Sequence, residues 1–243
     1  EFRRVLFRSL WQAATLYKAG KQSARTARLY QRYVREFPTQ LPQSIEARLY
    51  LAEHYKSQRD AKRWGYWLNE IINADRAAGT HRTPRSRTLA AEATLTLAQP
   101  RLTAYQKTTL RIPLKKSLKK KKVLMQKAIK AYERAAAYQI SDVATAATYQ
   151  IAEIYHDFAR ALTNSQRPKG LSAEELEQYT LLLEEQAYPF EEKAIDIHAA
   201  NLKHTTEGIY DQWVQKSQQQ LIKLEPARYA KSERSDPYAE AIQ

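Results

Sequence analysis

Apolar residues recur at intervals of three and four along almost the whole of this 243-residue chain, from Leu10 onward, in segments separated by short breaks. That spacing places them on one face of an α-helix, and the alternation expected of a half-buried strand is nowhere sustained. Only 5 glycines occur, and the 9 prolines fall mostly between the periodic segments, as expected where helices end. The sequence therefore predicts an all-α fold.

Local signals mark the ends and faces of individual helices. Ser172 and Glu175 have the spacing of a capping box, in which each side chain bonds the backbone N–H of the other residue, so a helix should begin there. A long apolar face is predicted before it, formed by Val143, Ala147, Ile151, Ile154, Phe158 and Leu162. We predict helices over residues 10–19, 23–37, 44–58, 60–77, 85–109, 114–138, 142–163, 172–187, 190–204 and 206–224.

Several segments share one helical register, and the clearest three surround Leu16-Tyr17, Leu51–Tyr55 and Ile151–Tyr155. The second and third of these place a large apolar residue, then Ala, then Tyr three positions later. Another segment places Ala128, Tyr132 and Ala135 at spacings of four and three. Small residues at such positions let helices approach closely, and the Tyr rings fill the space between helical hairpins.

These patterns resemble the tetratricopeptide repeat (TPR), and the resemblance covers residues 10–80 and 114–165. It departs from the family in having Ala where Gly is common. The resemblance implies a right-handed α-solenoid of stacked antiparallel helical hairpins that binds other proteins. The alternative that the residues leave open is a non-repetitive helical bundle.

A concave groove is the usual binding surface of such a solenoid, and the repeat register identifies which side chains should line it. A partner peptide or helix would lie along that groove. The residues predicted to line it are Leu49, Glu53, Lys56 and Ser57 in one unit and Tyr149, Glu153, His156 and Asp157 in another.

The carboxy-terminal part of the chain carries a second resemblance. Residues 188–233 look like the last part of large TPR proteins of the Gram-negative bacterial envelope. This likeness implies an envelope assembly and a periplasmic location, and it implies that the chain is a fragment of a longer one. The absence of cysteine excludes a disulfide framework and thiolate metal sites but leaves a cytoplasmic location open.

The first nine residues are set apart from the rest of the sequence. Leu6-Phe7-Arg8-Ser9 is the translation of the end of a common sequencing adapter, so we expect residues 1–9 to be an artefact and the native start to be missing. We divide the remainder into TPR-like hairpins (10–80), a connecting helix and linker (81–113), a carboxy-terminal repeat region (114–233) and a flexible tail (234–243).

The formal net charge is +14, which favours acidic partners or anionic surfaces. The strongest basic feature is a run at the start of the helix predicted over 114–138, formed by Lys115, Lys116, Lys119, Lys120, Lys121 and Lys122. Lys121 falls on the apolar seam of that helix and should extend along it to reach water. Arg25, Arg28, Arg32 and Arg35 form a second stripe, which either binds anions or keeps an outer helix dissolved.

Three partners compete for the lysine run. They are an anionic membrane surface, a nucleic acid, and the Glu-rich segment 174–192 of the same or a neighbouring molecule, which would give self-association. The sequence has no RNA-binding aromatic motif and no zinc finger, which argues against a nucleic acid. Binding to an anionic surface through the lysine run is the alternative to the protein-binding function.

The sequence offers no recognisable catalytic or cofactor-binding motif. His54, His81, His156, His198 and His204 have no metal-ligand spacing. Glycine-rich phosphate loops and nucleophile elbows are missing, and paired carboxylates such as Glu184-Glu185 diverge on a helix and belong to a solvated face. We therefore predict a protein that is not an enzyme and binds neither metal nor cofactor, with a catalytic site in a missing upstream region as the remaining alternative.

Overall fold

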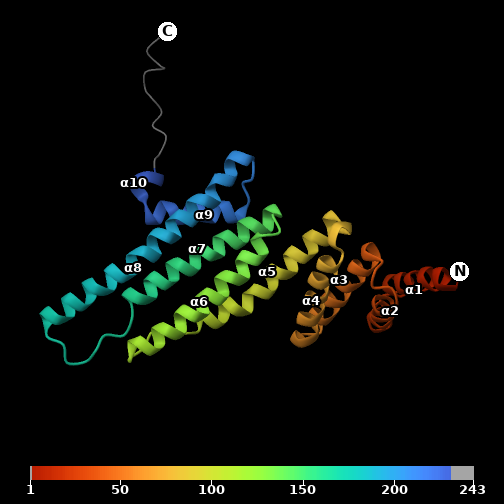
Figure 1. Cartoon of the computed structure of the whole chain (residues 1–243), viewed down its shortest axis with the longest axis horizontal. Coiled ribbons are helices and arrows are strands. Elements are labelled where there is room, and N and C mark those ends of the chain that lie inside the picture. Colours follow the sequence, from red (N-terminus) through yellow and green to blue (C-terminus); the bar gives the residue numbers. More distant parts are fainter. Residues whose placement is uncertain (1, 231–243) are drawn as a thin grey trace, which may run out of the picture. The chain divides into compact units, whose positions relative to one another are not determined.

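A computed structural model describes the backbone of residues 2–230 and the side chains of residues 5–230 (Figure 1). The predicted tail, 234–243, lies outside the described residues. Within them every regular element is helical, which confirms the all-α prediction. The elements are α1 (Phe2–Ala19), α2 (Ser23–Glu36), α3 (Leu41–Ser57), α4 (Ala61–Ala77), α5 (Pro84–Gln106), α6 (Leu114–Ala136), α7 (Ser141–Thr163), α8 (Ala173–Leu202), α9 (Gln212–Leu224) and α10 (Pro226–Tyr229), with short 3-10 turns at Gly79–His81 and Lys203–Glu207.

The chain divides into two compact units. Among the described residues, the first comprises those up to 108 and residues 120–147, and the second comprises residues 109–119 and those from 148 onward. The segment predicted as a connector, 81–113, lies mostly in the first unit, because α5 packs against α4 and contributes Leu89, Ala90 and Ala93 to its core. The division falls within α6 and α7, and each of these helices contributes residues to both units.

In the first unit, α1 to α5 pack each against the next, which is the arrangement of an α-solenoid. Their core is rich in aromatic rings, and Trp11 packs between Tyr30 and Tyr33 at centroid distances of 5.4 and 5.3 Å. The turn from α4 to α5 is fixed by a fully buried carboxylate. Asp75 Oδ1 accepts a 2.7 Å hydrogen bond from Ser86 Oγ, and Ser86 also forms the capping box of α5 with Thr83.

The positions that suggested the repeat are mostly buried in the first unit. Leu51, Ala52 and Tyr55 pack inward from α3, and Ala128, Tyr132 and Ala135 do so from α6. The first of the three register matches differs, because the side chain of Leu16 is 74% exposed and α1 packs through Leu10 and Ala14 instead. Burial at these positions is common to stacked helical hairpins, so the tetratricopeptide resemblance itself stays an expectation.

In the second unit, α8 packs on α7 and α9. The ring of Phe158 lies 4.6 Å from that of Phe190, centroid to centroid, and Leu183, Ala187 and Ala194 of α8 are buried. The predicted break between helices at residues 188 and 189 is wrong, because α8 continues through Pro189. That residue faces solvent, and the packing of the residues around it outweighs the roughly 3 kcal/mol that an interior proline costs.

The last long helix begins later than predicted. Residues 203–207 form a 3-10 turn, and Gly208 follows in the left-handed region at φ 77°, which ends the preceding helix. Asp211 then caps α9, its carboxylate accepting hydrogen bonds from the backbone N–H groups of Trp213 and Val214 at 2.8 and 2.9 Å.

The capping box predicted at the start of α8 is confirmed. Ser172 Oγ accepts a 3.2 Å hydrogen bond from the N–H of Glu175, whose carboxylate accepts a 2.8 Å bond from the N–H of Ser172. We expect Ser172→Ala to lower the stability of the first turns of α8 by about 1 kcal/mol, because the backbone N–H of Glu175 loses its acceptor. Hydrogen exchange of the α8 amides measures this. Ser23→Ala at the exposed start of α2, where no side chain caps the helix, should leave exchange unchanged.

Candidate functional site

The groove residues predicted on α3 lie on the surface of the first unit. Leu49 packs partly against the core, whereas Glu53 and Lys56 are exposed. The ammonium group of Lys56 lies 5.8 Å from the centroid of the Trp64 ring on α4. Glu53 and Lys56 are therefore accessible to a partner, as the prediction requires.

The groove residues predicted on α7 lie elsewhere than expected. Tyr149 packs against the rings of His198 on α8 and Trp213 on α9, at centroid distances of 5.6 and 5.4 Å. Burial raises the pKa of its hydroxyl. Tyr149, Glu153, His156 and Asp157 are all half-buried. The prediction that they line an open concave face is wrong for Tyr149 and Glu153, because α8 and α9 cover that side of α7.

A buried polar cluster joins these three helices, and the sequence did not predict it. His198 Nδ1 lies 3.2 Å from Ser217 Oγ, and His198 Nε2 lies 3.3 Å from Glu153 Oε1. Asn201 Nδ2 donates a 2.9 Å hydrogen bond to Ser217 Oγ. A carboxylate, an imidazole and a hydroxyl in this order resemble the relay that activates a nucleophile.

The burial of the cluster and its hydrogen bonds do not suit nucleophilic attack on a substrate. The side chains of His198 and Ser217 are fully buried, so a substrate cannot reach the hydroxyl. The Ser217 oxygen already accepts the hydrogen bond from Asn201. The contact between His198 and Glu153 is also not aligned as a hydrogen bond. We therefore assign the cluster to the packing of α7, α8 and α9, where buried polar groups need partners.

The half-buried His156 gives the second unit a pH dependence. Burial lowers the pKa of its imidazole below 6.5, and the nearby Glu153 carboxylate opposes that shift. The unfolded chain therefore binds the proton more readily than the folded chain does. The contribution of neutral His156 to the free energy of unfolding is thus fully present above pH 6.5 and is lost as the pH falls below that value. We expect His156→Gln to reduce the loss of unfolding free energy between pH 7 and pH 5, measured by denaturant titration. An equal reduction in the exposed control His81→Gln would contradict this assignment.

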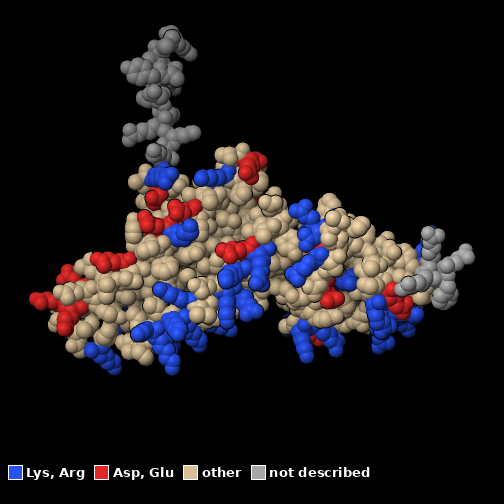
Figure 2. Space-filling model, viewed as in Figure 1, with Lys and Arg blue, Asp and Glu red and all other residues tan. Residues whose placement is uncertain are grey.

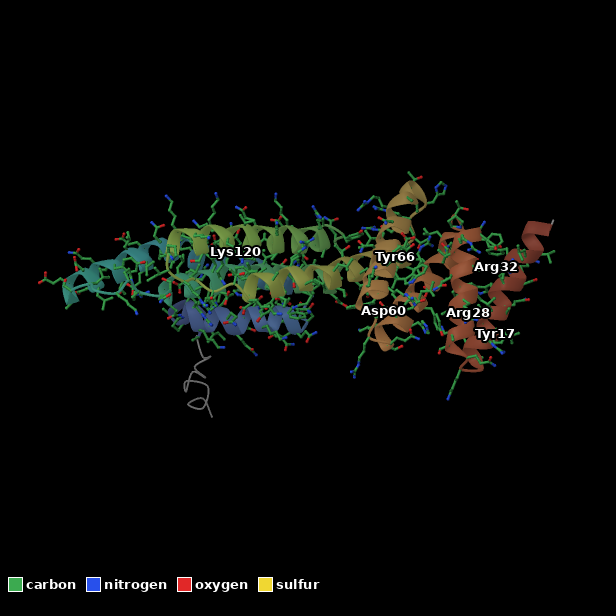
Figure 3. All side chains as sticks on the ribbon, turned by 90° about the horizontal axis from the view of Figure 1, so that it is seen from below. Tyr17, Arg28, Arg32, Asp60, Tyr66 and Lys120 are labelled. Atoms are coloured by element: carbon green, nitrogen blue, oxygen red, sulfur yellow. The ribbon has the colours of Figure 1, made fainter. Side chains whose placement is uncertain are left out.

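The lysine run lies in the first turns of α6, as predicted, and five of its six members are exposed: Lys115, Lys116, Lys119, Lys120 and Lys122. Lys and Arg side chains gather along the edge formed by this helix, and Lys120 can be seen on it (Figures 2 and 3). The arginine stripe on α2 is exposed as well, with Arg28 and Arg32 labelled. Arg32 forms a 2.7 Å ion pair with Glu36, four residues along the same helix.

Lys121 does not belong to the exposed patch, and the prediction that its side chain extends to water is wrong. Only 3% of the residue is exposed. Its ammonium group donates a 3.0 Å hydrogen bond to the backbone carbonyl of Thr108, just after α5, and lies 4.2 Å from the centroid of the Tyr105 ring. A cation is stabilised at the carboxy-terminal end of a helix, where backbone carbonyls lack helical partners.

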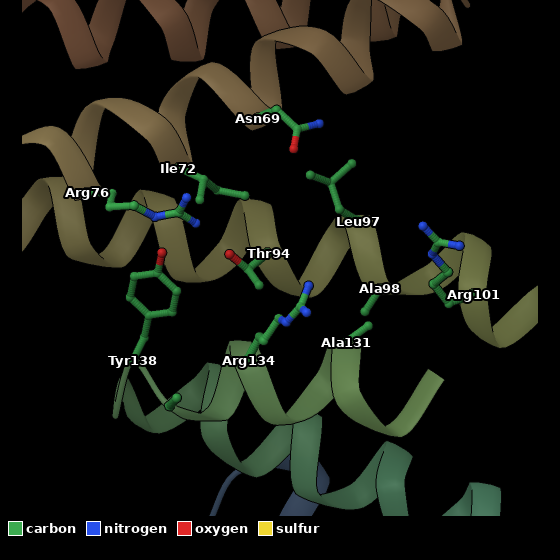
Figure 4. Close-up of a pocket in the computed structure, with 11 residues that line it drawn as sticks. Asn69, Ile72, Arg76, Thr94, Leu97, Ala98, Arg101, Ala131, Arg134 and Tyr138 are labelled. Carbon is green, nitrogen blue, oxygen red and sulfur yellow. The ribbon is translucent and has the colours of Figure 1, made fainter. Parts of the chain in front are cut away.

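A groove that the sequence did not suggest lies on the first unit between α4, α5 and α6 (Figure 4). Its volume is about 490 Å³. Each helix contributes one arginine to it, and Arg76, Arg101 and Arg134 are all exposed. None of the three forms an ion pair with a described residue. The other lining residues are Asn69, Ile72, Thr94, Leu97, Ala98, Ala131, Ala137 and Tyr138.

The residues that line this groove indicate which kind of ligand it can bind. Ile72 and Leu97 give it apolar side chains beside the polar Asn69 and Thr94, and its alanines leave room for a ligand side chain. The residues that line it include no carboxylate, so the guanidinium groups are not neutralised from within. A guanidinium group binds a carboxylate through two parallel hydrogen bonds. The groove therefore fits a ligand that combines apolar side chains with carboxylates, and we call it the arginine groove.

No protein-family model and no curated protein matches the chain. Among solved structures, one similar chain is described as "Computational Design of Self-Assembling Cyclic Protein Homooligomers". It is 16% identical, the match covers 93% of this chain and 90% of that one, and the TM-score is 0.32. At that level of similarity it supports no conclusion about fold or function.

Residues 5–230 contain no group of three or more His, Asp or Glu side chains placed to hold a metal ion. No helix within residues 2–230 combines the length and the hydropathy of a membrane span.

Proposed function

We propose that this chain is a non-enzymatic scaffold that binds an acidic, partly apolar segment of a partner protein. The observation that carries the proposal is the arginine groove, where three helices each contribute one arginine that forms no ion pair with a described residue, beside the apolar side chains of Ile72 and Leu97. Packed helical hairpins hold such a groove in one shape, which lowers the conformational cost of binding. The fixed arginines would select the charge and orientation of the bound segment.

We infer that the chain is a degenerate TPR protein of a Gram-negative envelope assembly, and what supports this is its sequence resemblance together with consecutive packing of α1 to α5. The arginine groove replaces the α7 residues of the sequence prediction as the binding surface. Glu53 and Lys56 on α3 are accessible to a longer partner.

Binding of a short synthetic peptide tests the proposal. The peptide is helical, carries leucines on one face flanked by glutamates, and is labelled for fluorescence anisotropy. Replacing Arg76, Arg101 and Arg134 together by Gln should weaken binding at least tenfold, because each lost charge-assisted hydrogen bond costs about 1.5 kcal/mol or more.

The matched control replaces Arg25, Arg28 and Arg35 of α2 by Gln. These arginines are exposed on the same unit and give the same change of net charge. The control should bind the peptide with nearly wild-type affinity. Equal weakening in both triple variants would mean that net charge alone attracts the peptide, and the groove would be abandoned as the site.

The exposed lysines of α6 favour a second candidate function, the binding of an anionic surface. Each lysine near an anionic membrane contributes roughly 1 kcal/mol, so five could hold the chain there at low salt. Co-sedimentation with phosphatidylserine vesicles and with heparin beads across a salt series separates the two functions. Retention at physiological salt that is lost when Lys115, Lys116 and Lys119 become Gln would favour this candidate.

A further inference from the structure

The first half of α8 presents an acidic and apolar surface to solvent. Residues 172–192 contain seven Glu and no Lys or Arg. The Glu side chains gather at the start of this helix (Figure 2). Among them Leu181, Leu182 and Tyr188 are 53%, 52% and 58% exposed. Apolar groups of this size on an exposed acidic helix are typical of a docking segment.

Helical spacing gathers the exposed groups on one side of α8. Leu181 and Tyr188 are seven residues apart and therefore lie two turns apart on the same face. Glu177, Glu184 and Glu185 lie three or four residues from Leu181 and share that face. Glu174 and Glu192 lie on the same face in the neighbouring turns. Leu183 and Ala187 point the other way and are buried. The outward face thus has an apolar centre bordered by carboxylates.

This face is the chemical complement of the arginine groove. The groove is lined by the apolar side chains of Ile72 and Leu97 together with Arg76, Arg101 and Arg134, and the helix has an apolar centre bordered by carboxylates. We propose that α8 of one chain docks in the arginine groove of a second copy, so that the chain assembles with itself. The proposal rests on the proposed function, because it takes the groove to bind acidic segments.

The contacts follow from this complementarity. Leu181 and Tyr188 contact Ile72 and Leu97 of the groove lining, where burial removes their apolar surface from water. The surrounding glutamates accept paired hydrogen bonds from the three guanidinium groups. The lysine run on α6 is the competing basic surface, but it presents charge along one helix and lacks the enclosing walls that α4, α5 and α6 give the groove.

The two surfaces differ from each other, so their contact is heterologous. Each chain has one groove and one acidic helix, and a bound copy therefore still offers both for further contacts. Such contacts close into a ring if the rotation between neighbours allows it and otherwise continue as an open chain. Either outcome gives a mass above that of one chain, which rises with protein concentration and falls with added salt.

Sedimentation equilibrium of the full chain over a concentration series tests the proposal. The wild type should associate. Two charge-reversed variants should remain monomeric at concentrations where the wild type associates: Arg76, Arg101 and Arg134 changed to Glu, and Glu177, Glu184 and Glu185 changed to Lys. Glu175 is left in place because its carboxylate caps α8. Mixing the two variants joins a normal groove to a normal helix, and also a reversed groove to a reversed helix, so association should return.

The control changes Lys115, Lys116 and Lys119 to Glu, which alters the net charge by the same amount as the groove variant and should leave the wild-type mass unchanged. Circular dichroism of every variant checks that it is folded. A wild type that is monomeric throughout the series overturns the proposal. So does a control that dissociates as fully as the groove variant, because the lysine run would then be the docking surface.

A labelled peptide with the sequence of residues 172–193 separates this inference from the proposed function. If it binds the wild type at least tenfold more tightly than the groove variant, the self-docking contact is supported. If the synthetic Leu/Glu peptide binds the groove but the 172–193 peptide does not, the inference is wrong and the proposed function stands. If neither peptide binds, both are wrong.

Discussion

Replacing Lys121 by Glu is expected to lower the free energy of unfolding by about 3 to 5 kcal/mol, the cost of leaving a buried charge without its partner. The carboxylate would take the place of an ammonium group that donates to the Thr108 carbonyl and lies over the Tyr105 ring. It would face a carbonyl oxygen and the electron-rich face of the ring, both of which repel negative charge. The side chain is buried, so water cannot screen this repulsion.

The neighbouring residue provides the matched control. Lys120 is exposed on the same turn of α6, and Lys120→Glu makes the same change of net charge. It should shift stability by no more than about 0.5 kcal/mol, as surface substitutions usually do. Guanidinium denaturation followed by tryptophan fluorescence measures both variants, since Trp11, Trp64 and Trp67 all lie in the first unit. Equal effects would show that Lys121 is solvated.

Replacing Phe158 by Ala should destabilise the second unit by about 3 to 5 kcal/mol, the range measured when a buried aromatic ring is removed. The ring is fully buried and packs against Phe190 of α8 at 4.6 Å between centroids. Its loss leaves a cavity between α7 and α8. The rigid helices on either side can close that cavity only in part, and the Phe190 ring loses its neighbour.

Hydrogen exchange of the slowest amides in α7 and α8 measures the effect of Phe158→Ala. Tyr188→Ala removes an aromatic ring of similar size from the exposed face of α8, and at concentrations where the chain is monomeric it should change these rates little. Unchanged protection in Phe158→Ala would contradict the burial of this ring between α7 and α8.

Most helices could be predicted because apolar periodicity and capping are local properties. The capping box of Ser172 and Glu175 involves residues on one turn, so the sequence alone determined it correctly. The predicted break at Pro189 failed for the opposite reason. Whether a proline ends a helix depends on how strongly the rest of that helix packs, and Leu183, Ala187 and Ala194 pack α8 along both sides of it.

The candidate site could not be predicted from local patterns. Arg76, Arg101 and Arg134 come from three helices and meet only when those helices pack. Lys121 was misassigned because its partner, the Thr108 carbonyl, belongs to the end of another helix. The same holds for His198 and Ser217, which α8 and α9 bring together. The one local signal was the frequency of alanine on α5 and α6, which leaves room for a groove without indicating its charge.

The path of the chain between its two units limits how the protein can be dissected. Residues 109–119 belong to the second unit but are flanked on both sides by residues of the first. No single truncation of the chain therefore yields either unit intact. A truncation anywhere between α5 and α7 removes residues of both units. Because α6 and α7 each serve both units, loss of order in one unit would shorten a helix that the other needs.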